Sequence, residues 1–130
     1  MAADPIATSR IAACACGQLQ ARCTGAPAKV SLCHCRACQR RTGSTYGIAA
    51  FFPRECVTVQ GAAQTYSRAS DSGYPVTFHF CPHCGSTVYW EASRKPDMVA
   101  VAVGAFGDPA FPAPTQEVYT ECRHAWVPEL

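Results

Sequence analysis

Cysteine spacing is the feature that most constrains what this chain can fold into. Ten cysteines occur in 130 residues, and seven of them stand in three short motifs, "CACG" at 14–17, "CHCRAC" at 33–38 and "CPHCG" at 81–85. Sulfurs this close in sequence are better suited to sharing one metal ion than to forming separate disulfides. Disulfides are the alternative, but the N-terminus carries Asp4 and no apolar run, unlike a secretory signal. We therefore expect metal ligands.

The first and third motifs form a matched pair. Each ends on a glycine, Gly17 or Gly85, which tolerates the positive φ that a tight turn needs after its second sulfur. Two such turns, remote in sequence, predict a closed tetrahedral zinc site of a structural kind. Its expected ligands are Cys14, Cys16, Cys81 and Cys84. Such an ion would add folding free energy to a domain whose core is small.

The middle motif offers three ligands, Cys33, Cys35 and Cys38, where a closed site needs four. A catalytic zinc typically keeps three protein ligands and one open position. Three thiolates make a soft site that would favour a further sulfur ligand. The motif therefore predicts a second, catalytic-type zinc whose fourth ligand is the substrate.

Two other interpretations of the middle motif stay open. The site could be closed by a spare residue, because three more cysteines and four histidines exist. These are Cys23, Cys56, Cys122, His34, His79, His83 and His124. Cys23 and Cys56 lie in strand-like runs and resemble small buried hydrophobic residues, whereas Cys122 is not excluded by its pattern. A redox-active thiol cluster is the other interpretation, although the βαβ setting of thioredoxin-like proteins is missing.

The rest of the chain predicts an all-β domain. Runs rich in β-branched and aromatic residues alternate with turn residues. They lie at 19–23, 28–33, 45–52, 56–60, 63–67, 75–81, 87–92, 98–106 and 117–122. One short helix is expected after Cys35, ending at Gly43, and the proline-rich segment 107–116 is expected to be an extended connector. We expect a single domain at 14–130 after an N-terminal extension at 1–13.

Charge and hydropathy exclude several classes of partner. The formal net charge is only +2, far from the basic excess of proteins that bind nucleic acid through phosphate contacts. The longest apolar run, 98–106, is about half of the roughly 20 residues that span a bilayer. We expect a cytoplasmic protein that acts on a small molecule, with no nucleic-acid or membrane partner. The oligomeric state stays open.

Four motifs carry a family resemblance. In order and spacing, "CACG", "CHCRACQRRTGS", "FCPHCGS" and "RHAW" resemble the glutathione-dependent formaldehyde-activating enzyme family, also called centromere-protein-V-like, from Cys14 to Trp126. The resemblance implies an Mss4-like (β-tent) fold and two zinc ions. It places the structural zinc on the four paired cysteines and the catalytic-type zinc on Cys33, Cys35 and Cys38.

The resemblance also implies an activity. The enzyme that names the family joins glutathione and formaldehyde into S-hydroxymethylglutathione, which is carbon-sulfur lyase chemistry in reverse. The family further suggests that glutathione loosens the second zinc. Near that zinc, Arg36, Arg40 and Arg41 are candidates for binding the substrate carboxylates, because Arg pairs with carboxylates in a bidentate way. Their alternative role is a solvated helix face.

Two other functions compete with the enzyme. A non-catalytic zinc-binding module for protein interaction would need an exposed apolar patch, for which Phe51, Phe52 and Phe111 are candidates, although such aromatics more often lie in a core. Metal or redox sensing through the middle motif would release zinc when the thiolates are oxidised. The sequence assigns no acid or base for the reaction: His34 is adjacent to Cys35, but the sequence does not give the direction of its side chain.

Overall fold

The computed structural model describes residues 8–70 and 73–130. It contains ten strands and one α-helix, so the predicted all-β domain with a single short helix is confirmed. The elements are β1 (Ser9–Ala13), β2 (Gln20–Thr24), β3 (Lys29–Cys33), α1 (Arg36–Thr42), β4 (Gly47–Pro53), β5 (Val57–Gln60), β6 (Gln64–Ala69), β7 (Pro75–Phe80), β8 (Thr87–Ala92), β9 (Met98–Ala102) and β10 (Gln116–Val118). Three 3₁₀ turns cover Arg54–Cys56, Val103–Phe106 and Thr120–Cys122.

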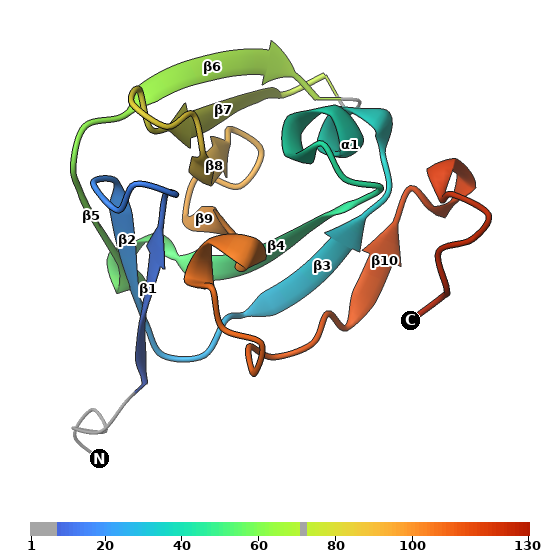
Figure 1. Cartoon of the computed structure of the whole chain (residues 1–130), viewed down its shortest axis with the longest axis horizontal. Helices are drawn as coiled ribbons and strands as arrows, with labels where there is room; N and C mark the ends of the chain where they lie inside the picture. Colours follow the sequence, from blue (N-terminus) through green and yellow to red (C-terminus); the bar gives the residue numbers. More distant parts are fainter. Residues whose placement is uncertain (1–7, 71–72) are drawn as a thin grey trace.

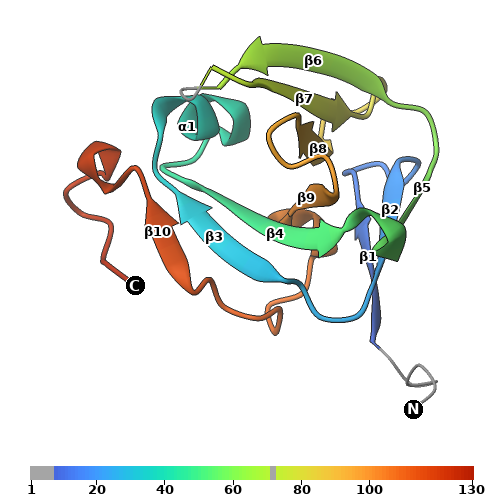
Figure 2. The same cartoon turned by 180° about the vertical axis from the view of Figure 1, so that it is seen from behind.

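The strands form two sheets. A small sheet has the order β1-β2-β5, and a large one has the order β10-β3-β4-β9-β8-β7-β6. Neighbouring strands are antiparallel, except that β10 runs parallel to β3. Helix α1 follows β3 in the chain. On one side of the helix are the ends of β3 and β4, and on the other side is the β6–β7 hairpin (Figures 1 and 2).

The two faces of the large sheet have different roles. Successive side chains of a strand point to opposite faces. In β4, Ala50 and Phe52 are fully buried in the core that the large sheet shares with residues such as Ala21 and Cys23 of the small sheet. Ala49 lies on the opposite face, which carries the cavities described below. One face of the large sheet therefore packs in the core, and the opposite face carries the cavities.

The boundaries of several strands differ from those that the sequence predicts. The run 98–106 is a strand only to Ala102, and Val103–Phe106 forms a 3₁₀ turn. The run 117–122 likewise leaves β10 at Val118, because Tyr119 adopts a left-handed conformation with φ 55° and Thr120–Cys122 then turns. Residues 9–13, which we expected in an extension, form β1 of the small sheet.

Two predictions concern the ends of the chain and membranes. The expected extension at 1–13 includes residues 1–7, which lie outside the described residues, so the domain boundary at 14 stays a prediction. Within residues 8–70 and 73–130, no helix combines the length and the hydropathy needed to cross a bilayer.

Candidate metal centres

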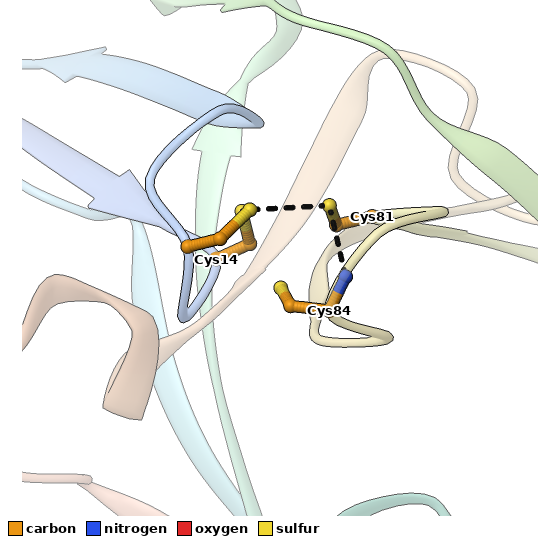
Figure 3. A group of neighbouring side chains, drawn as sticks. Cys14, Cys81 and Cys84 are labelled. Carbon is orange, nitrogen blue, oxygen red and sulfur yellow. Dashed lines mark hydrogen bonds between the residues drawn. The ribbon is translucent and has the colours of Figure 1, made fainter.

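The four paired cysteines meet in one cluster. The Sγ atoms of Cys14, Cys16, Cys81 and Cys84 all lie within 4.8 Å of one another. Cys16 Sγ lies 3.6 Å from Cys14 Sγ and 3.7 Å from Cys81 Sγ. A tetrahedral zinc with bonds of about 2.3 Å places its sulfurs about 3.8 Å apart, so this donor set fits a zinc ion. In Figure 3, Cys14 points from one loop toward Cys81 and Cys84 of the other.

The two loops that carry these cysteines repeat one hydrogen-bond pattern. In the first, the amide of Cys14 donates to Leu19 and the amide of Gly17 donates back to Cys14, each at 3.0 Å. In the second, Cys81 donates to Ser86 and Gly85 donates to Cys81, at 3.0 and 2.8 Å. The glycines have φ angles of 86° and 81°, the left-handed region that side chains rarely adopt. Each glycine thus closes a turn around a pair of thiols.

Polar hydrogens converge on the sulfurs of the four-cysteine cluster. Gln18 Nε2 donates to Cys81 Sγ at 3.0 Å, and the backbone amides of His83 and Cys84 donate to it at 3.3 and 3.5 Å. Burial would raise the pKa of Cys81, but these donors outweigh it and hold the pKa below its ordinary value. The second loop therefore favours the thiolate of Cys81, the form in which cysteine binds a metal, whereas the pKa of Cys16 in the first loop is raised to about 11.

The middle motif forms a second cluster at the junction of β3 and α1. Cys33 is the last residue of β3, Cys35 caps the N-terminus of α1, and Cys38 lies in its first turn. The amide of Cys38 donates to Cys35 Sγ at 3.3 Å, and the three Sγ atoms lie within 4.8 Å of one another. Among the described residues, no fourth cysteine, histidine or carboxylate joins this group.

None of the seven spare residues joins the three sulfurs in the described part of the chain, and several of them have other contacts. His34 turns away from the sulfurs on either side of it, because its Nε2 lies 2.8 Å from Glu117 Oε1. His124 Nε2 lies 2.8 Å from Gln39 Oε1, and Gln39 Nε2 donates to the carbonyls of His34 and Cys122. Cys23 lies in β2 of the small sheet and is fully buried, as its strand pattern predicts.

A cavity opens directly beside the three-cysteine cluster. Its volume is about 180 Å³, and its walls include Cys33, Cys38, Arg41 and Trp90. The floor is made of small side chains, since Cys33 pairs with Gly47 and Ser31 pairs with Ala49 in the β3–β4 register. Two of the three cysteines, Cys33 and Cys38, therefore border a space large enough for a small thiol head and a one-carbon aldehyde, while Cys35 is buried.

Arg41 is the cation of this cavity. Its guanidinium lies over the Trp90 ring at 4.2 Å from the centroid and over Phe78 at 5.7 Å. Hydrogen bonds from the thiols of Cys33 and Cys35, together with the Arg41 charge, lower the pKa of Cys38 despite its burial. Gly47 makes room for this arginine, because a Cβ at that position would come within 2.8 Å of Arg41 Nη2.

The three arginines named from sequence are not equivalent. Arg40 and Arg41 line a neighbouring cavity of about 440 Å³ together with Arg68 and aromatic residues. Arg36 is exposed and is not among the residues that line this cavity or the one beside the cysteines. Trp90, Gly47 and Arg68 belong to no local sequence motif, because their positions at these cavities depend on how the strands pair.

The aromatic patch considered for protein interaction is not exposed. Phe52 is fully buried in the core, while Phe51 and Phe111 are half-buried. Phe111 stacks on Phe106 with ring centroids 4.6 Å apart. These side chains pack within the fold, as most aromatics in strands do.

Comparison with known proteins gives a family and a fold. The family model described as glutathione-dependent formaldehyde-activating enzyme matches residues 9–122. A Rhodobacter sphaeroides protein, solved by crystallography as a structural genomics target, has a similar structure with a TM-score of 0.62 and 21% sequence identity. The similarity covers 82% of this chain and 98% of that one, and it bears on the fold alone. No curated protein matches the chain.

Proposed function

Since the chain belongs to the glutathione-dependent formaldehyde-activating enzyme family, we propose that it joins a thiol such as glutathione to formaldehyde or another small electrophile. The fold is of the Mss4-like (β-tent) type, and its two cysteine clusters can each hold a metal ion. The proposed enzyme is a carbon-sulfur lyase that also runs in the direction of synthesis. The observation that carries the proposal is the three-cysteine cluster open to a cavity that Arg41 lines.

We propose zinc for both clusters. Four sulfurs at tetrahedral spacing suit a closed structural ion, and three sulfurs beside a cavity suit an ion with an open position. Zinc bound at the three-cysteine cluster would supply a Lewis acid that lowers the pKa of an incoming thiol. Free thiols at all ten cysteines agree with a reducing, cytoplasmic location, which we include in the proposal.

The proposed reaction is an addition in which atoms and charge balance without a redox partner. The thiol sulfur attacks the carbonyl carbon, a carbon-sulfur bond forms, and the carbon-oxygen double bond becomes single. The proton lost from the thiol is recovered on that oxygen, which gives the hydroxymethyl thioether. The reverse reaction breaks the carbon-sulfur bond and returns thiol and aldehyde.

The protein's own side chains would orient and shield the reactants. Trp90 and Phe51 wall the cavity and limit the entry of water, which strengthens electrostatic interactions inside it. Arg41, beside Cys38 and held over Trp90, can stabilise the negative charge that develops on the aldehyde oxygen. Holding both reactants in a cavity of about 180 Å³ supplies proximity.

Exchange NMR of glutathione with ¹³C-formaldehyde tests the proposal, because the uncatalysed addition sets a measurable background. We expect the zinc-loaded protein to accelerate formation and breakdown of S-hydroxymethylglutathione well above that background. Cys38→Ser, folded and still carrying one zinc, should return the rate to background. A doubly zinc-loaded wild type that leaves the rate at background for formaldehyde with every thiol tried would overturn the proposal.

A further inference from the structure

The chain contains only two lysines, Lys29 and Lys95, and the fold brings them together from positions 66 residues apart. Both line a cavity of about 400 Å³, and Arg94 lines it as well. The Lys29 ammonium lies 4.9 Å from the centroid of the Phe51 ring, on the cavity wall. Three cations therefore gather around one hollow of a protein whose formal net charge is only +2.

In the described part of the chain, these cations have no ion-pair partner: no salt bridge joins Lys29, Arg94 or Lys95 to a carboxylate. Partial burial and then the neighbouring Lys95 charge lower the pKa of Lys29, so the two ammonium groups repel each other. The repulsion is weak because Arg94 and Lys95 are exposed to solvent, and a bound anion would relieve it.

The basic cavity continues into the cavity of the three-cysteine cluster. Ser31, Phe51 and Val118 belong to the walls of both. Lys29 and Cys33 are four residues apart on β3 and so share one face of the strand. Their Cα atoms are separated by roughly 13 Å, at about 3.3 Å per residue. Ser31 lies between them on that face and accepts a hydrogen bond from Gln116.

We propose that the hollow lined by Lys29, Arg94 and Lys95 is a subsite for a carboxylate of the thiol substrate. The inference rests on the proposed function, because it places the substrate sulfur at Cys33, Cys35 and Cys38. When the thiol is on the middle residue of a tripeptide, each end carboxylate lies only part of the full extent of roughly 10 Å from the sulfur, and the long lysine side chains reach along the remaining distance. The substrate class is then a peptide thiol with an anionic end, of which glutathione is an example, rather than a small neutral thiol.

The subsite also divides the roles of the two basic regions. The β6–β7 hairpin borders both cavities, but the one with Arg40, Arg41 and Arg68 is also lined by α1, whereas Lys29 lies at the other end of β3. A thiol peptide with an acid group at each end could then contact both regions while its sulfur stays at the cysteines. The negative charges at both ends of the substrate would then determine which thiols bind. The positive charge of the protein near the sulfur would act in the reaction.

Calorimetry with S-methylglutathione and its dimethyl ester tests the subsite without requiring turnover. We expect the acid to bind wild type at least about tenfold more tightly than the ester. Lys29→Met/Lys95→Met should remove most of that preference, and Lys95→Met alone should reduce it. Lys29→Arg/Lys95→Arg should restore it, and Arg22→Met, on the small sheet, should leave it unchanged. Circular dichroism and a zinc count check that each variant is folded and loaded.

Turnover measured in parallel separates this inference from the proposed function. If the lysine variants keep the preference for the acid, or if wild type shows none, the subsite is wrong whatever the turnover. If wild type turns over glutathione and the variants raise KM for it without changing KM for cysteamine, both proposals stand. If turnover is absent but the acid preference disappears in the variants, the subsite stands and the proposed reaction falls.

Discussion

His34 Nε2 lies 2.8 Å from Glu117 Oε1, which fastens the residue between Cys33 and Cys35 to strand β10. His34 is fully buried, and its backbone amide also bonds to the carbonyl of Val118 at 3.1 Å. Neither contact touches the sulfurs. Together these two contacts hold the segment that carries Cys33 and Cys35 against β10. Strand β10 therefore helps to position two of the three cysteines.

Glu117→Gln should therefore weaken metal binding at the three-cysteine cluster and spare the four-cysteine cluster. Outer contacts of this type typically change metal affinity 10- to 100-fold, because they orient the ligands. Competition with a chromophoric chelator should show one zinc leaving at lower chelator concentration than in wild type. Glu91→Gln is the matched control for the three-cysteine cluster: Glu91 Oε1 lies 2.7 Å from His79 Nε2, and neither residue lines the cavity beside that cluster. Equal zinc release from both variants would contradict the role of Glu117.

The two clusters should differ in what they contribute to stability. Cys81 is fully buried and ties the loop after β7 to the loop after β1, so Cys81→Ser should cost more than about 4 kcal/mol or abolish folding. Cys38→Ser removes a thiol at the edge of a cavity and should cost less than about 1.5 kcal/mol. Urea unfolding with zinc counts by native mass spectrometry measures both. A larger loss for Cys38→Ser would reverse the assignment of structural and open sites.

Arg41 and Arg36 should differ in catalysis. Arg41→Met removes a cation that lies beside Cys38 and lines the cavity, and we expect kcat/KM for glutathione and formaldehyde to fall about 10- to 100-fold. Arg36→Met changes an exposed side chain and should leave kcat/KM within about twofold. Steady-state kinetics of zinc-loaded proteins decide the point. Similar losses in both variants would mean that α1 acts through its overall charge.

Removing Lys95 should slightly stabilise the protein. In the folded protein the pKa of Lys29 lies below its ordinary value of 10.5. The charged form of Lys29 therefore destabilises the fold, and this effect is fully present at any pH below the folded pKa. Lys95→Met relieves part of this repulsion and should raise the free energy of unfolding at pH 7 by about 0.3 kcal/mol. The gain should shrink in 1 M salt and vanish above roughly pH 10.5, where both lysines are neutral. A loss of stability at pH 7 would show that Lys95 has an attractive partner.

Much of the fold and the division of the cysteines could be predicted from the chain, because those signals are local. Alternating apolar residues marked most of the strands, and spacings of one and two residues marked the two ligand groups. β1 was missed because its five residues sit at the edge of a three-stranded sheet with a largely exposed pattern. The end of β10 was missed because Tyr119 adopts a left-handed conformation that its type does not suggest.

The surroundings of the second cluster could not be predicted, because they depend on tertiary contacts. Lys29 and Lys95 meet only once the sheet has formed. The separation of Arg36 from Arg41 follows from helix geometry, since five residues at about 100° each place them roughly 140° apart around the helix axis. The angle between the two arginines around the helix axis can be predicted from the sequence. Which side of the helix faces a cavity cannot.

Native mass spectrometry of the freshly purified protein and of Cys33→Ser, with and without glutathione, shows whether the second zinc site is open. We expect two zinc ions per wild-type chain and one in Cys33→Ser. With glutathione, wild type should gain one glutathione or lose one zinc, while S-methylglutathione, which lacks the thiol, should leave both zincs in place. Two zincs that ignore every thiol, or a Cys33→Ser protein that still holds two, would contradict an open three-cysteine site.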